Sequence, residues 1–230
     1  MASPTYESPR IVCIPYAGVG ASAFARWRTL WGDALVITLP GREARHAMAS
    51  LRSIDAMAAW TADVVNQSGL MSTTLFGHSL GALVAYEATR LLANVEPEAV
   101  TRLVVSACLA PTSTPPIKLS GIEDNDAFMQ AVGALGGFPA EIADEPVLMR
   151  YALPILRADL QAIDTYHHVG GKRLNIPLLA LGGDDDPFVP SERLAEWAQF
   201  TDGPFDSEVF AGDHFFIHRH ADRVARLVKS

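Results

Sequence analysis

Short apolar runs alternate with amphipathic runs along most of this chain, and this alternation constrains its fold more than any other feature. The middle apolar runs carry few polar residues, which is typical of parallel strands covered on both faces. Strands that alternate with helices predict an α/β fold with a mostly parallel, doubly wound sheet. The expected strands are 10–16, 34–40, 73–79, 102–109, 176–183 and 205–211, and the expected helices are 22–31, 55–67, 81–93, 191–200 and 218–229.

Residues 111–172 interrupt the alternation, because they contain helix-like runs and no convincing strand. An insertion between two strands of a parallel sheet usually lies over the carboxyl edge, where ligands bind. We therefore expect a helical lid at about 111–172, with ordinary crossover helices as the alternative. A length of 230 residues is compatible with one α/β domain, so we expect residues 1–230 to form a single domain.

The composition is that of a globular protein, with 49% hydrophobic and 19% charged residues. A net charge of -8 and scattered Lys and Arg residues argue against a nucleic-acid partner. No apolar run reaches the roughly 18 residues that span a bilayer, and the N-terminus does not have the pattern of a signal peptide. We expect a cytoplasmic protein with no membrane association, and buried thiols at Cys13 and Cys108 rather than a disulfide.

The segment TTLFGHSLGALVAYE contains Gly77-His78-Ser79-Leu80-Gly81, which fits G-x-S-x-G between a strand-like and a helix-like run. This context predicts a nucleophile elbow, a sharp turn that exposes Ser79 and frees the amide of Leu80 to stabilise an oxyanion. The alternative is a glycine-containing turn in which the serine caps a helix. We expect His78 to pack, because its side chain should diverge from that of Ser79.

An elbow serine needs a general base, and in this class of hydrolase the chain order is serine, acid, histidine. The run LGGDDDP follows an apolar strand and offers Asp184, Asp185 and Asp186. We favour Asp186, which directly precedes a proline, although the sequence leaves the choice open. The other aspartates would then belong to a solvated acidic turn.

The expected base is His214, which lies in a loop directly after the last strand-like run. Competing histidines occur at His167, His168, His218 and His220. Neither the aspartates nor the histidines have the spacing of a calcium loop or a zinc motif, so we expect no metal.

The loop GVGASA, residues 18–23, also fits G-x-G-x-x-A, the short form of a dinucleotide fingerprint, and Glu43 lies at a plausible distance for a ribose acid. In a serine hydrolase, the loop after an early strand instead supplies the second oxyanion donor. We assign that donor to the amide of Ala17. The hydrolase interpretation accounts for three elements in the correct order, and no later segment is typical of a nicotinamide site, so we expect no cofactor.

Several longer blocks together resemble type II thioesterases of polyketide and nonribosomal peptide biosynthesis. They are PYAGVGASAF, LPGREAR at 39–45, GHSLGALVAYE at 77–87, LRADLQAIDTY at 156–166, LGGDDDP, and GDHFF at 212–216. The blocks occur in order over residues 14–216 and are far more specific than the pentapeptide alone. The chain departs from the family at Val19, where another glycine is common, and in PGREARHAM, which lacks an expected acid.

The resemblance implies an α/β-hydrolase fold with a short helical lid. It also implies hydrolysis of acyl thioesters carried on the phosphopantetheine arm of acyl or peptidyl carrier proteins, in an editing role on aberrant or stalled chains. The family's catalytic residues carry over to Ser79, Asp186 and His214. The alternative activity is a carboxylesterase or acyl-CoA hydrolase that uses the same triad.

Two further sets of residues are candidates for substrate and partner contacts. Apolar residues of the lid region would line an acyl chamber or simply pack on the sheet: Phe128, Met129, Leu135, Phe138, Met149 and Leu153. Four arginines would attract an acidic carrier protein despite the net negative charge: Arg42, Arg45, Arg150 and Arg157.

Overall fold

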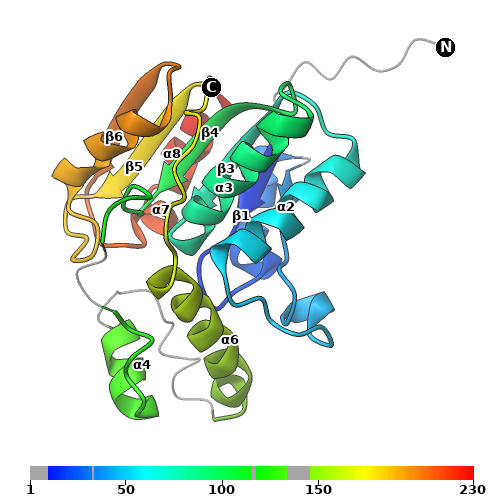
Figure 1. The fold of residues 1–230 in the computed structure, drawn as a ribbon. Helices are drawn as coiled ribbons and strands as arrows, with labels where there is room; N and C mark the ends of the chain where they lie inside the picture. The colour runs from blue at the N-terminus through cyan, green and yellow to red at the C-terminus, as the bar shows by residue number, and fades with distance from the viewer. Residues whose placement is uncertain (1–9, 33, 115–117, 134–145) are drawn as a thin grey trace.

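The computed structural model describes residues 10–32, 34–114, 118–133 and 146–230, with no side chains described for 146–149 (Figure 1). Six strands form one sheet in the order β2-β1-β3-β4-β5-β6, and every neighbouring pair is parallel. The expected parallel sheet is therefore confirmed. The strands are β1 (Arg10–Ile14), β2 (Leu35–Val36), β3 (Thr73–His78), β4 (Val100–Ser106), β5 (Leu178–Gly183) and β6 (Phe205–Phe210).

Both faces of the sheet are covered, and alternate strand residues point to opposite faces. In β1, Val12 and Ile14 pack in one cluster with α2 (Ile54–Ser68), α3 (Leu80–Val95) and the 3-10 helix η3 (Ser191–Phe200). Ile11 and Cys13 pack on the other face with α1 (Ala25–Trp31) and α8 (Ala221–Lys229). This double coverage explains why the central strands read as continuous apolar runs.

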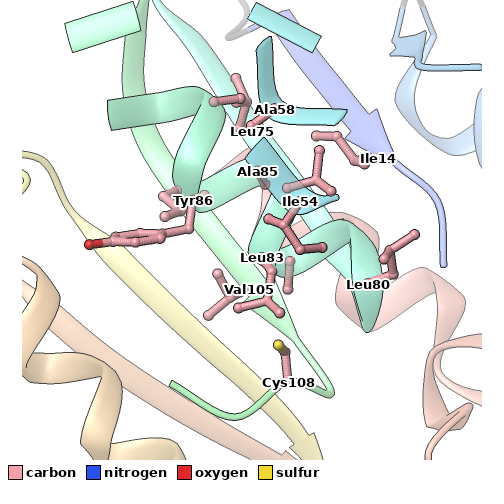
Figure 2. Packing of buried hydrophobic residues seen from close by; sticks show 14 of the residues in the cluster. Ile14, Ile54, Ala58, Leu75, Leu80, Leu83, Ala85, Tyr86, Val105 and Cys108 are labelled. Carbon is pink, nitrogen blue, oxygen red and sulfur yellow. The ribbon is translucent and has the colours of Figure 1, made fainter. Parts of the chain in front are cut away.

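Figure 2 shows the first of these clusters from nearby, with Leu80, Leu83 and Ala85 of α3 lying among strand residues. The helix α2 on the same face has clear end signals. Ser53 accepts a hydrogen bond from the Ala56 amide at 3.2 Å, and Gly69 ends the helix in the left-handed conformation.

The strand order changes direction between β1 and β3. From β1 the chain moves outward to β2, returns to the other side of β1 to form β3, and then continues outward through β4, β5 and β6. The connections after β1 and β3 therefore diverge, and ligands bind at such a switch point in parallel sheets. The loop that follows β1 and the turn after β3 are the two segments that the sequence assigned to an oxyanion site.

Several elements differ from those expected in extent or type. The second strand is limited to Leu35–Val36, and beyond it the Ile37 amide donates to the Cys13 carbonyl. The fourth strand ends at Ser106, because Ala107 adopts a positive φ of 48°. The predicted last helix is divided into α7 (Phe216–Arg219) and α8, and residues 191–200 form a 3-10 helix.

The segment 111–172 between β4 and β5, called the insertion below, contains α4 (Asn125–Gly133) and α6 (Pro146–Asp164). Figure 1 shows both helices beyond one end of the sheet. They share a small apolar cluster of their own, made by Leu119, Phe128, Val132, Leu156 and Leu160. Two short 3-10 helices, η1 (Ala21–Phe24) and η2 (Glu43–Arg45), complete the described elements around the site.

Candidate active site

Ser79 occupies a strained turn between β3 and α3. Its φ of 55° and ψ of -119° lie outside the regions that L-residues usually adopt, and helix α3 begins at the next residue. The Ser79 amide donates to the Ser106 carbonyl at 2.8 Å, which ties the turn to the neighbouring strand β4. Such local strain is found at functional sites and persists only where the surroundings enforce it.

The two glycines of the turn are required by close backbone approaches. A Cβ on Gly77 would lie 2.1 Å from the Gly81 carbonyl oxygen, and a Cβ on Gly81 would lie 2.1 Å from that of Ile14. The second approach also shows that the turn is packed directly against the end of β1. The sequence pattern G-x-S-x-G thus follows from the space available on each side of Ser79.

The structure brings the three distant polar side chains together in one hydrogen-bonded chain. The His214 Nε2 lies 2.9 Å from the Ser79 Oγ, and its Nδ1 lies 2.7 Å from the Asp186 Oδ2. Ser79 comes from the end of β3, Asp186 from the loop after β5, and His214 from the loop after β6. In parallel strands these ends share one edge of the sheet, so residues far apart in sequence meet there.

The carboxylate next to His214 belongs to Asp186. Its other oxygen accepts hydrogen bonds from the amides of Phe188 at 2.9 Å and Val189 at 3.1 Å, so the carboxylate is held from both sides. Asp184 instead accepts from the Gly212 amide at 2.8 Å, and both Asp184 and Asp185 are exposed. The neighbouring aspartates therefore shape the loop, as an acidic turn would.

His78 packs next to the hydrogen-bonded residues Ser79, His214 and Asp186 but is not one of them. It is fully buried, its Nδ1 lies 2.9 Å from the Ser106 Oγ, and its ring centroid is 5.5 Å from that of His214. Burial, with a smaller contribution from repulsion by His214, lowers the pKa of His78 well below its usual value. His78 therefore stays neutral at physiological pH and packs against the histidine above it.

An apolar cavity of about 120 Å³ opens beside Ser79 and His214. Its lining comes from α3, from the segment after β4, from the insertion and from the loop after Asp186. The lining residues include Leu83, Cys108, Leu109, Leu119, Leu160, Ile163, Phe188 and Val189. Burial raises the pKa of the Cys108 thiol to about 12, so this wall of the cavity carries a neutral thiol.

Of the two roles left open for the apolar lid residues, the structure shows packing for those that can be assessed. Phe128 packs inside the insertion's own cluster, and Met129 and Leu153 lie against that cluster rather than on the cavity. Leu135, Phe138 and the side chain of Met149 lie outside the described residues. The insertion instead contributes Leu119 and, from α6, Leu160 and Ile163. Which residues of α6 face the cavity depends on how this helix is rotated, which composition does not show.

The glycine-rich loop after β1 is occupied by the protein's own acids. Glu43 accepts hydrogen bonds from the Ser22 amide at 3.0 Å and the Ser22 hydroxyl at 2.5 Å, and a Cβ on Gly20 would lie 2.5 Å from its carboxyl carbon. The Gly18 amide donates to Asp159 at 2.8 Å. Carboxylates therefore take the donors that a dinucleotide phosphate would need, which argues against that alternative.

The four arginines expected to contact a carrier protein differ in their burial and in their contacts. Arg42 is buried and paired with Asp159, so its assignment as a surface charge was wrong. Arg157 bonds to Asn125 and the Ile122 carbonyl, and it lies over the Phe128 ring. Arg150 is exposed and Arg45 is half-buried near Trp60, so these two remain candidates.

The competing histidines have other surroundings. His168 lies near Glu87, His218 near Tyr16, and the His220 ring lies 2.8 Å from the Ala211 carbonyl oxygen. In the described part of the chain, no group of three or more His, Cys, Asp or Glu side chains is placed to hold a metal ion. Among the same residues, no helix combines the length and apolar character needed to cross a membrane.

Comparison with known proteins gives a consistent set of relatives. The family model described as a thioesterase domain matches residues 9–230. Thioesterase PikA5 of Streptomyces venezuelae is 36% identical over 218 residues, which cover 91% of this chain and 75% of PikA5.

Two solved structures share both fold and sequence with this chain. The type II thioesterase BorB from the borrelidin biosynthetic cluster is 32% identical, with a TM-score of 0.87 over 99% of this chain and 93% of BorB. YbtT, a type II thioesterase from the yersiniabactin NRPS/PKS biosynthetic pathway, is 31% identical, with a TM-score of 0.86 over 100% of this chain and 98% of YbtT.

Proposed function

The chain belongs to the thioesterase family, and on that premise we propose that it is a type II editing thioesterase that uses Ser79, His214 and Asp186. Its substrates would be acyl groups attached as thioesters to the phosphopantetheine arm of acyl or peptidyl carrier proteins. The observation that carries the proposal is the hydrogen-bonded chain Ser79–His214–Asp186 at the mouth of an apolar cavity.

In the first stage, the Ser79 Oγ attacks the thioester carbonyl carbon while the His214 Nε2 takes the hydroxyl proton. Asp186 holds the imidazole through Nδ1 and stabilises the imidazolium that forms. The oxyanion is met by the amide of Leu80, at the N-terminus of α3, and by the amide of Ala17, in the loop after β1. The C–S bond then breaks, and His214 returns its proton to the departing phosphopantetheine thiolate.

In the second stage, water attacks the acyl-serine carbonyl, and His214 takes a proton from that water. Collapse of the second tetrahedral intermediate breaks the ester bond and returns a proton to the Ser79 oxygen. The free acid and the regenerated enzyme are the products, so the two stages balance as one hydrolysis. The acyl chain would occupy the cavity beside Leu83 and Cys108, with the insertion as a lid that limits water.

The carrier protein is the proposed partner because BorB and YbtT are thioesterases of biosynthetic clusters or pathways of this type. Of the four arginines considered, Arg150 and Arg45 are the two that could contact an acidic carrier, and charged groups at an interface mainly steer association. Replacing both by glutamate would then raise KM for the acyl carrier while leaving turnover of a small thioester unchanged.

A panel of substrates tests the proposal: acyl-loaded carrier proteins, the matching acyl-CoA thioesters, and p-nitrophenyl esters. We expect the highest kcat/KM for acyl carrier proteins, and Ser79→Ala should lower kcat on all of them by roughly 10⁴–10⁶. A preference for acyl-CoA or for simple esters would overturn the carrier assignment and indicate an acyl-CoA hydrolase or a carboxylesterase.

A further inference from the structure

A buried ion pair joins two sequence blocks that the proposed mechanism does not use. Arg42 belongs to LPGRE near η2, and Asp159 belongs to LRADL on helix α6 of the insertion. Both Arg42 terminal nitrogens contact the carboxylate, at 2.7 and 2.8 Å, in the two-nitrogen geometry that arginine favours. The side chains are only 2% and 0% exposed.

The same two side chains also hold the backbone of the loop after β1. The Gly18 amide donates to the Asp159 carboxylate at 2.8 Å, and the Arg42 guanidinium donates to the Val19 carbonyl at 3.1 Å. One residue of the pair therefore accepts from this loop while the other donates to it. These two loop residues directly follow Ala17, whose amide is a proposed oxyanion donor.

Helix α6 also packs on this loop. Gly18 has a φ of 81°, and a Cβ at this position would lie 3.1 Å from the Leu156 Cδ1. Ala17 itself lies against the apolar cluster of the insertion. The loop is therefore enclosed by LPGRE on one side and by α6 on the other, and its conformation depends on both.

The energetics of buried charges favour a positioning role for the Arg42–Asp159 ion pair over a purely stabilising one. Desolvation offsets much of the attraction within a buried ion pair, and an apolar replacement of similar volume is often equally stable. Backbone donors that stabilise an oxyanion must instead be held close to one geometry. An ion pair that also accepts from the Gly18 amide and donates to the Val19 carbonyl meets that second requirement.

We propose that Arg42 and Asp159 are positioning residues that fix the loop carrying the Ala17 amide, so that the oxyanion site is complete only when α6 is docked. The inference rests on the proposed function, because it assumes that Ala17 serves the serine. The insertion then does more than cover the cavity, since its docking also assembles half of the oxyanion site.

The decisive variant removes both charges at once. Arg42→Met/Asp159→Leu leaves no unpaired buried charge, so it should fold, yet the Gly18 amide loses its acceptor. We expect kcat on an acyl carrier to fall about 10- to 100-fold, as for a small misplacement of catalytic groups, with KM changed less than about twofold.

Two further variants separate positioning from stability. Val65→Ala, in the buried core of α2, lowers the melting temperature without touching the loop and should keep the wild-type kcat. Arg42→Lys keeps the charge but loses the two-nitrogen fork, and it should lower kcat by about fivefold, less than the double variant. Unchanged kcat in Arg42→Lys and in the double variant would overturn the inference, as would an equal loss of kcat in Val65→Ala.

The rate of covalent labelling by a small fluorophosphonate gives a readout that is independent of the thioester substrate. It requires only an activated serine and its oxyanion site, so we expect the double variant to label about 10- to 100-fold more slowly than wild type. If wild type labels but hydrolyses no thioester, the proposed substrate fails, and this labelling difference still decides the role of Arg42 and Asp159. Equal labelling rates would overturn that role.

Discussion

The two sides of the active site are built in different ways. On the sheet side, Ser79 is fixed by direct backbone packing, since glycines at 77 and 81 allow approaches that any side chain would block. On the insertion side, the helices rely on a small apolar cluster and on the Arg42–Asp159 ion pair. The first side sits on a large core that covers both faces of the sheet, whereas the second reaches this core through Ala162, Ile163 and Tyr166.

The sheet side therefore fixes the geometry of the catalytic residues, whereas the insertion side can vary the shape of the cavity. The serine, the histidine and the aspartate come from ends of parallel strands, where the sheet fixes their relative positions. The insertion supplies Leu119, Leu160 and Ile163 to the cavity wall, so changes there would alter which acyl group fits without moving the reacting atoms. Sites carried on rigid elements keep their geometry, and loops and insertions carry variation.

Glycine substitutions should show the largest difference in stability between the two sides. Gly81→Ala places a Cβ 2.1 Å from the Ile14 carbonyl oxygen, and we expect it to lower the free energy of unfolding by about 3 kcal/mol or more. Gly121→Ala, in the insertion, meets no atom within 4 Å and is the matched control. Denaturant unfolding of both variants measures the effect, and equal stability would contradict the close packing of the turn.

Large-to-small changes of leucine should give an intermediate effect. Leu103→Ala, in the buried strand β4, should cost about 2–5 kcal/mol of stability and leave the preference among acyl chains unchanged. Leu160→Ala borders an existing cavity, so it should cost no more than about 2 kcal/mol while shifting that preference toward bulkier chains. A changed acyl preference in Leu103→Ala, with none in Leu160→Ala, would contradict the division of roles.

A smaller effect is expected from pH, through the buried His78 on the sheet side. Because burial lowers its pKa in the folded protein, the unfolded chain binds the extra proton first as the pH falls below about 6.5. Stability should therefore decrease between about pH 6.5 and 5, with at most about 1.4 kcal/mol per pH unit from this residue. His218, whose pKa is lowered by burial, contributes in the same direction.

His78→Asn keeps a polar partner for Ser106 and removes the titrating ring. Melting temperatures of wild type and His78→Asn across this pH range check the prediction. The variant should lose less stability on acidification than wild type, and parallel pH profiles would show that His78 is not the group responsible.

The sequence predicted the sheet and the order of the site residues because these follow from local patterns. Apolar runs indicate covered parallel strands, and G-x-S-x-G indicates a turn that has no room for a Cβ atom at its two glycines. The preference for Asp186 over its neighbours was a choice among adjacent residues, and only the loop geometry shows which carboxylate lies against His214.

Other features could not be predicted because they depend on packing between distant segments. Arg42 and Asp159 lie 117 residues apart, and nothing local marks either one as buried. The cavity walls follow from the rotation of α6, which composition does not fix. The contact between Ser106 and His78 joins two strand ends, and no local pattern indicates it, because Ser106 lies inside the apolar run 102–109.

The most direct test of the account is to locate a fluorophosphonate adduct by mass spectrometry. We predict a single adduct on the peptide that contains Ser79, absent in Ser79→Ala and formed at least about 100-fold more slowly in His214→Ala. Failure of the wild-type protein to form an adduct, or an adduct that persists in Ser79→Ala, would contradict the claim that His214 and Asp186 activate Ser79.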